Sequence, residues 1–80
     1  MKNIMDKLTG LFERVFDGEI DVSNISEDSR LIEDIGMNSI GLLYMAMAVE
    51  EEFGTSFTND DFSLLRTVGD VIKKIEEKTN

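Results

Sequence analysis

Residues 33–43, EDIGMNSIGLL, contain the most informative helix start in the chain. Acidic residues precede Ser39, and an uncharged, mostly apolar run covers residues 40–49. Asn38 is a favoured helix cap, and Gly54 is a favoured residue just after a helix end. The stretch therefore predicts a helix from about Ser39 to Phe53.

Two further helices are indicated outside this one. Residues 2–17 carry apolar side chains with helical spacing, and Gly18 is a plausible end. Residues 67–78 repeat that spacing after Thr67, which stands three residues before Asp70 as in a capping box. The predicted apolar faces consist of Ile4, Leu8, Leu11, Phe12 and Val15 in the first segment and Val68, Val71, Ile72 and Ile75 in the last.

Two connecting segments complete the pattern. Thr58 and Asp61 have capping-box spacing, which predicts a short helix over residues 58–65. Residues 18–38 form a long loop, and a loop this long in a compact domain is usually functional or held by its own side chains. We expect it to be held by its aliphatic residues, which are Ile25, Leu31, Ile32 and Ile35. Residues 17–28 lack the glycine and glutamate that an EF-hand calcium loop requires.

These elements predict an all-α fold, a small antiparallel bundle of three longer helices and one short third helix. With 80 residues, the chain is expected to form a single domain over residues 1–80.

The charge is unevenly distributed along the chain. The net charge is −9, but residues 17–61 hold twelve acids and one base, and each end is about +1. The negative electrostatic field of this middle segment repels nucleic acid and anionic lipid and attracts basic protein surfaces. The alternative is a solvated acidic surface that serves solubility alone.

Several classes of function are excluded by composition. The chain has neither Cys nor His, so it lacks disulfides, thiolate metal ligands and the usual general base. No apolar signal region follows Met1, and the uncharged run of residues 40–49 is far shorter than the ~20 residues of a membrane-spanning helix. We therefore expect a cytoplasmic protein without membrane insertion.

The predicted helix after Asn38 has two apolar faces. One is a core stripe of Leu42, Met45, Ala46, Val49 and Phe53, and the other consists of Ile40, Leu43, Tyr44 and Met47. A small bundle rarely buries both faces of one helix. Either the long loop covers the second face, or that face is a docking surface.

The sequence allows two roles for Ser39. It is either an ordinary helix-start residue or an acceptor for a phosphate-linked group, because a helix N-terminus favours phosphate. Catalysis by Ser39 is not expected, since the chain has no His and Met37 stands where a nucleophile elbow needs glycine.

Residues 33–57, EDIGMNSIGLLYMAMAVEEEFGTSF, resemble the central segment of acyl carrier proteins. The hallmark of that family is an acid-Leu-Gly-x-Asp-Ser-Leu run followed by an apolar helix that ends in Glu-Glu-x-Phe. This chain has DIGMNSI over residues 34–40 and EEEF over residues 50–53. TVGDVI, residues 67–72, resembles the start of the family's last helix, and the match runs from Ser29 to Ile75.

The resemblance implies a free-standing, non-catalytic carrier with a four-helix bundle. It implies that a phosphopantetheinyl transferase attaches 4'-phosphopantetheine from coenzyme A to Ser39, beside Asn38, and that the arm holds acyl groups as thioesters. It also implies docking of acyl-transferring and chain-elongating enzymes through basic patches, by a monomer that binds no nucleic acid. The expected docking residues are Ile40, Leu43, Tyr44, Met47, Glu50 and Glu51.

Three departures from the family pattern concern the pathway. Asn38 replaces the usual Asp, and Gly41 and Tyr44 stand where fatty-acid carriers often have acids. The cargo of fatty-acid synthesis and that of a specialised polyketide-type pathway both stay open. The alternatives are a peptidyl or aminoacyl carrier and an unmodified helical adaptor.

Overall fold

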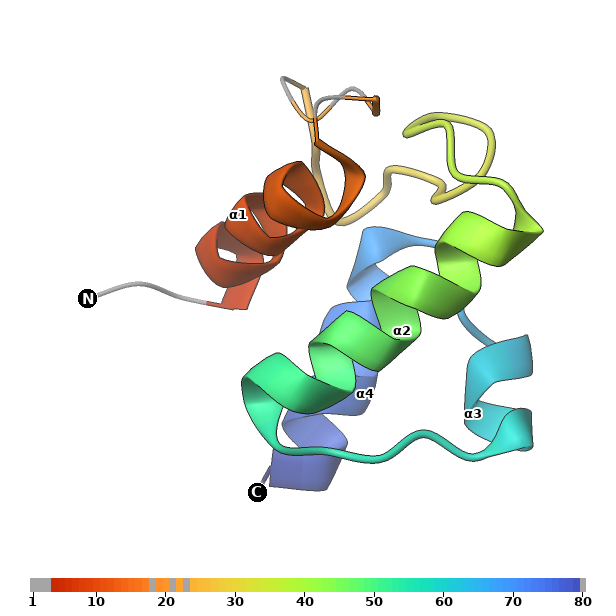
Figure 1. Cartoon of the computed structure of the whole chain (residues 1–80). Coiled ribbons are helices and arrows are strands. Elements are labelled where there is room, and N and C mark those ends of the chain that lie inside the picture. Colours follow the sequence, from red (N-terminus) through yellow and green to blue (C-terminus); the bar gives the residue numbers. More distant parts are fainter. Residues whose placement is uncertain (1–3, 18, 21, 23, 80) are drawn as a thin grey trace.

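The computed structural model describes residues 4–17, 19–20, 22 and 24–79. Within these residues the helices are α1 (Ile4–Phe16), α2 (Ser39–Phe53), α3 (Asn59–Ser63) and α4 (Val68–Thr79). In Figure 1, α2 runs diagonally across the front, with α1 to its left, α3 to its right and α4 behind it. The predicted all-α bundle of three longer helices and one short third helix is confirmed.

The helix bounds that fall within the described residues agree with the sequence patterns to within two residues, and the predicted start of the first helix at residues 2–3 lies outside them. α2 begins and ends where it was predicted to. α1 ends at Phe16 because Asp17 adopts a left-handed conformation with φ of 47°, and Gly18 lies outside the described residues. α3 is shorter than the predicted 58–65, because Thr58 is its cap and not its first helical residue.

One apolar core joins the three longer helices and the long loop. α3 contributes no buried residue, so it acts mainly as a connection. The buried apolar side chains are Leu8, Leu11 and Phe12 of α1, Leu31, Ile35 and Met37 of the loop, Leu42, Met45, Ala46 and Val49 of α2, Leu65, and Val68, Val71 and Ile75 of α4. Burial of these side chains is the main stabilising contribution to the bundle.

Backbone hydrogen bonds fasten the long loop to the start of α4. Leu31 N–H donates to the Arg66 carbonyl at 2.8 Å, and Val68 N–H donates to the Ser29 carbonyl at 3.0 Å. The loop is therefore held by backbone contacts as well as by its aliphatic side chains.

Two predicted core residues are exposed, and both predictions were wrong. Ile32 is 48% exposed, because a helix-like turn after Arg30 directs its neighbours Leu31 and Ile35 inward together. Val15 is 37% exposed although it follows the spacing of α1. It lies over a seam where α2 offers Ala48 and Gly41, which are too small to cover it.

The capping predictions for α3 and α4 are confirmed. Thr58 and Asp61 exchange side-chain to backbone hydrogen bonds at 3.0 Å each. Thr67 and Asp70 repeat the exchange at 3.0 and 3.2 Å. Each pair satisfies backbone N–H groups that a helix start leaves without intrahelical acceptors.

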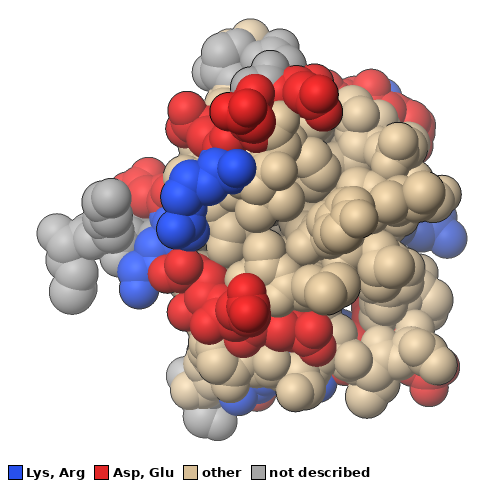
Figure 2. All heavy atoms as spheres, in the orientation of Figure 1, with Lys and Arg blue, Asp and Glu red and all other residues tan. Residues whose placement is uncertain are grey.

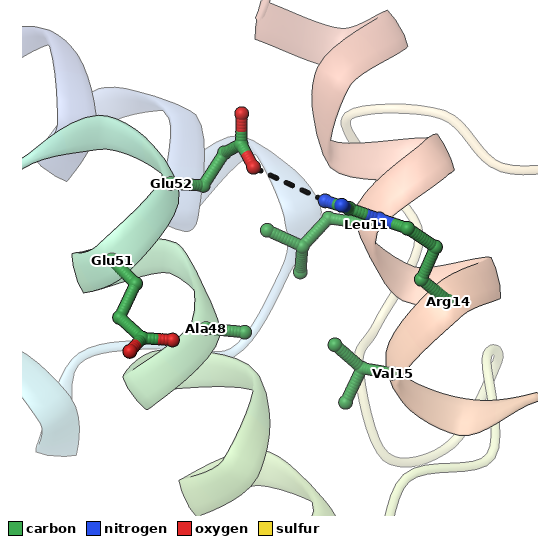
Figure 3. Close-up of a pocket in the computed structure, with 6 residues that line it drawn as sticks. All are labelled: Leu11, Arg14, Val15, Ala48, Glu51 and Glu52. Atoms are coloured by element: carbon green, nitrogen blue, oxygen red, sulfur yellow. Dashed lines mark hydrogen bonds and ion pairs between the residues drawn. The ribbon is translucent and has the colours of Figure 1, made fainter.

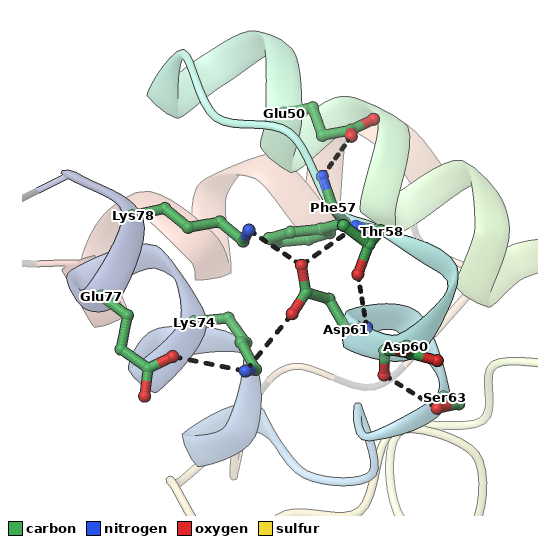
Figure 4. Close-up of polar contacts among 9 residues, drawn as sticks. All are labelled: Glu50, Phe57, Thr58, Asp60, Asp61, Ser63, Lys74, Glu77 and Lys78. Atoms are coloured by element: carbon green, nitrogen blue, oxygen red, sulfur yellow. Dashed lines mark hydrogen bonds and ion pairs between the residues drawn. The ribbon is translucent and has the colours of Figure 1, made fainter.

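A charged cluster ties α3 to α4 (Figure 4). The Asp61 carboxylate contacts Lys78 Nζ at 2.8 Å and Lys74 Nζ at 3.3 Å. The hydrogen bond from Lys78, together with those from Thr58 and Lys74, holds the pKa of Asp61 far below its usual value. The helix pair is thus joined by an ion cluster.

Candidate functional site

Ser39 is the first residue of α2, and its side chain is exposed. Asn38 caps the helix, since its Oδ1 accepts the Gly41 N–H at 2.7 Å. On the other side of the cap, Met37 is buried and its N–H donates to the Leu31 carbonyl at 3.0 Å. The serine is therefore presented at the tip of a helix whose entry is fixed.

The electrostatics of this tip suit an anion. The first N–H groups of a helix have no intrahelical acceptors and mark the positive end of its dipole. α2 has no acid in its first turn, and its cap is a neutral amide. A phosphate ester on Ser39 would lie beside these N–H groups without a carboxylate in the same turn, so the residues present fit a phosphate-linked group.

The acids that precede Ser39 in the sequence are partly neutralised within the loop. The Asp34 carboxylate accepts the Arg30 backbone N–H at 2.8 Å and contacts Arg30 NH2 at 3.0 Å. Hydrogen bonds from the Arg30 guanidinium, and then from its backbone N–H, lower the pKa of Asp34. Asp34 thus stabilises the turn that leads to Met37.

Nothing near Ser39 supplies the parts of a catalytic centre. The chain contains no His or Cys, and the described residues hold no cluster of acids that could bind a metal ion. No helix in the described part of the chain combines the length and the apolarity needed to cross a membrane.

The second apolar face of α2 is open to solvent. Its exposed fractions are 65% for Ile40, 52% for Leu43, 59% for Tyr44 and 54% for Met47. The long loop leaves more than half of each of these side chains exposed, so it covers at most part of this face. Figure 2 shows a broad uncharged surface over the front of α2, with acidic side chains gathered at the C-terminal end of the helix.

The three glutamates at that end are not equivalent. Glu50 is half-buried, and its carboxylate accepts the Phe57 N–H at 2.7 Å, which fastens the segment after α2 (Figure 4). Glu52 forms an ion pair with Arg14 of α1 at 3.1 Å (Figure 3). Glu51 is exposed and lines a cleft of about 310 Å³ along the α1–α2 seam. Of the two predicted docking acids, Glu51 is the more available, and Glu50 already has an internal role.

A second cleft beside the serine was not anticipated from the sequence. It has a volume of about 340 Å³ and lies between the end of α1 and the start of α2. The cleft is lined from the end of α1 and the following segment by Val15, Phe16, Glu19 and Ile20. It is lined from the start of α2 and the preceding segment by Gly36, Met37, Asn38, Ile40, Gly41 and Tyr44. Helical periodicity describes one helix at a time, so it gives no signal for a contact between Phe16 and Gly41.

Comparison with known proteins places this arrangement in a family. A family model described as "Phosphopantetheine attachment site" matches residues 6–75. The acyl carrier protein of Chlamydia trachomatis serovar D is 44% identical over 57 residues, which cover 71% of this chain and 74% of that protein. The acyl carrier protein of Thermotoga maritima is 37% identical over 59 residues, which cover 74% of this chain and 73% of that protein.

The fold is also that of a solved structure. The solution structure of holo acyl carrier protein from Geobacter metallireducens superposes with a TM-score of 0.77 at 22% identity, and the match covers 92% of this chain and 83% of that one. With the family model spanning most of the chain and relatives of about 40% identity, the chain belongs to the acyl carrier protein family of phosphopantetheine-attachment domains, whose members are carriers and not enzymes.

Proposed function

We propose that Ser39 is the attachment residue for 4'-phosphopantetheine in this carrier. The observation that carries the proposal is an exposed serine at the capped, uncharged start of a long helix, within the segment that the family model matches. When bound, the group supplies a terminal thiol that holds an acyl chain as a thioester. This supply of a thiol is consistent with a chain that has no Cys of its own.

In this proposal the protein's residues orient the acceptor and stabilise the ester. A phosphopantetheinyl transferase would transfer the group from coenzyme A to the Ser39 oxygen, with adenosine 3',5'-bisphosphate as the leaving group. Because this chain has no His, the base that takes the Ser39 proton would belong to the transferase. Asn38 fixes the first turn by accepting the Gly41 N–H, so a phosphate on Ser39 would lie at the positive end of the α2 dipole. Because Asn38 is neutral, it does not repel the new negative charge.

We further propose that partners dock on the open face of α2. Its apolar residues begin directly after Ser39 and extend about two turns along α2, as Ile40, Leu43, Tyr44 and Met47, and Glu51 follows with Glu50 at the edge. Methionine and tyrosine suit an adaptable interface. The partners in this account are the transferase and acyl-transferring and chain-elongating enzymes. Their contact is apolar at the front of α2 and basic at its C-terminal end.

The oligomeric state, the location in the cell and the pathway are proposed together with the attachment site. Residues 1–80 act as a single carrier domain, as a monomer in the cytoplasm, for fatty-acid synthesis or a related polyketide-type pathway. Tyr44 and Gly41, which replace acids often found in fatty-acid carriers, favour the specialised pathway. They also keep open a peptidyl or aminoacyl cargo.

Intact-mass measurement tests the proposal. The purified protein is incubated with coenzyme A and a promiscuous phosphopantetheinyl transferase, beside Ser39→Ala and the control Ser56→Ala, which alters another exposed serine. We expect one added phosphopantetheine on the wild type and on Ser56→Ala, and none on Ser39→Ala. An unchanged wild-type mass, under conditions that load a control carrier, would favour the unmodified adaptor.

A further inference from the structure

The end of α1 touches the turn of α2 that carries the serine. Phe16 is the last residue of α1, and the chain reverses after it, with Glu19 N–H donating to the Phe16 carbonyl at 2.9 Å. The half-buried Phe16 side chain packs against the core and lines the 340 Å³ cleft beside Asn38 and Ile40. The ring therefore lies against the first turn of α2.

A side chain at Gly41 would be crowded by Phe16 and Asn38. A Cβ atom added there would lie 3.1 Å from Cε1 of Phe16 and 3.2 Å from Oδ1 of Asn38. Both distances are shorter than ordinary van der Waals contact between such atoms. Gly41 is helical and does not have a positive φ, so glycine is needed here for room and not for backbone conformation.

The same glycine is part of the cap. Its N–H donates to Asn38 Oδ1 at 2.7 Å, and the next N–H, from Leu42, donates to the Asn38 carbonyl at 2.9 Å. A side chain at position 41 would therefore push either on the ring of Phe16 or on the amide that caps the helix. Ser39 lies between Asn38 and Gly41 in that turn, so it is displaced when either one moves.

We propose that Phe16 and Gly41 are positioning residues for the modification of Ser39. This inference rests on the proposed function. The ring of Phe16, seated against the bare Cα of Gly41, holds the Asn38 cap and with it the orientation of the serine hydroxyl. α1 thereby contributes to the reaction at the start of α2 without contacting the transferred group. Group transfer is sensitive to displacements of ~1 Å, so a shift of a few tenths of an ångström is measurable in the rate.

Steady-state loading with coenzyme A and a promiscuous transferase tests this. Gly41→Ala should lower kcat/KM for the carrier about threefold to tenfold, mainly through kcat, because the docking face is unchanged. Gly10→Ala is the matched control, since a Cβ there meets nothing within 4 Å and the residue is exposed in α1. Gly10→Ala gains the same helix propensity as Gly41→Ala and should be loaded at the wild-type rate.

A double-mutant cycle separates positioning from general stability. Phe16→Leu removes the ring, so Gly41→Ala should lose most of its effect in that background, whereas independent effects would simply add. Amide exchange supplies a second readout that does not require the variant to be loaded. The Gly41 N–H should exchange faster in Phe16→Leu than in the wild type, while amides of α4 stay protected.

Two results would overturn the inference. One is a Gly41→Ala variant that loads as fast as Gly10→Ala. The other is an effect of Gly41→Ala that is equally large with and without the Phe16 ring. A wild-type protein that accepts no phosphopantetheine contradicts the proposed function instead, so the two failures are distinguishable.

Discussion

Single residues fix both ends of the helix that carries Ser39. Asn38 accepts an N–H from the first turn, and Gly54 closes the other end with φ of 66° and a hydrogen bond from its N–H to the Glu50 carbonyl. Both residues could be predicted from the sequence, because a cap depends on local chemistry that the sequence contains. The Phe16–Gly41 contact could not, because it depends on where α1 lies.

We expect Asn38→Ala to lower the free energy of unfolding by about 1 kcal/mol, because the Gly41 N–H loses its acceptor. Asn38→Asp keeps an acceptor and should cost little. Urea titrations followed by circular dichroism measure both changes. Equal losses for Ala and Asp would mean that the side-chain oxygen is not what stabilises this end of the helix.

At the scale of the element, α2 has one buried face and one open face. Val49 is fully buried, whereas Met47 is 54% exposed. Val49→Glu should bury an unpaired charge and cost about 3 kcal/mol or more, enough to unfold much of so small a domain. Met47→Glu should change stability by only about 0.5 kcal/mol, which thermal melts can compare.

The same open face gives a functional prediction. Leu43→Glu and Met47→Glu should slow loading of Ser39 while leaving the fold intact, because both residues lie on the proposed docking face. Leu43→Ser, which adds no charge, separates lost apolar contact from added repulsion. Leu64→Glu is the control, since Leu64 is 58% exposed after α3 and outside the proposed face. Equal slowing by Leu64→Glu would contradict docking on α2.

The contact between α3 and α4 has a predictable pH dependence. Because the pKa of Asp61 is lowered in the folded state, its carboxylate contributes stability above the ordinary Asp pKa of about 4. As pH falls below that value the unfolded chain takes up the proton first, and this stability is lost. Asp61→Asn should therefore be less stable than the wild type at pH 7, with the difference narrowing towards pH 3.

Asp60→Asn is the matched control for that measurement. Asp60 is adjacent and exposed, and it lies outside the contacts that Asp61 makes with Lys74 and Lys78. The Asp60→Asn substitution removes one negative charge, as Asp61→Asn does, without breaking the contacts of Asp61 with Lys74 and Lys78. A difference between wild type and Asp61→Asn that stays constant from pH 7 to pH 3 would contradict a stabilising ionised Asp61.

The sequence predicted the positions of the helices better than it predicted which side chains the rest of the fold covers. α2 and the core faces of α2 and α4 follow from periodicity, since each is a property of one segment. The exposure of Val15 and Ile32 does not follow, because it depends on the small residues of α2 and on the helix-like turn that the loop makes after Arg30. The internal contact of Glu50 with the Phe57 N–H likewise depends on the path of the chain after Gly54.

At the scale of the whole molecule, the central acidic segment should repel itself when folded. Residues 17–61 carry a net −11, which already includes the charge of Arg30 in its ion pairs with Glu33 and Asp34. Raising the ionic strength from about 0.01 M to 0.15 M shortens the screening length from ~30 to ~8 Å and should raise the melting temperature. A melting temperature that stays constant or falls would mean that the lost attraction of the ion pairs equals or exceeds the relieved repulsion.

In the proposed function, the bundle presents Ser39 as the attachment residue of a carrier. Fragment mass spectrometry of the loaded wild-type protein tests it most directly, because it identifies the modified residue without altering any side chain. If Ser39 is the attachment residue, the added phosphopantetheine is found on Ser39 and on no other serine. Modification at a different residue, or a protein that stays unmodified beside a loaded control carrier, would contradict it.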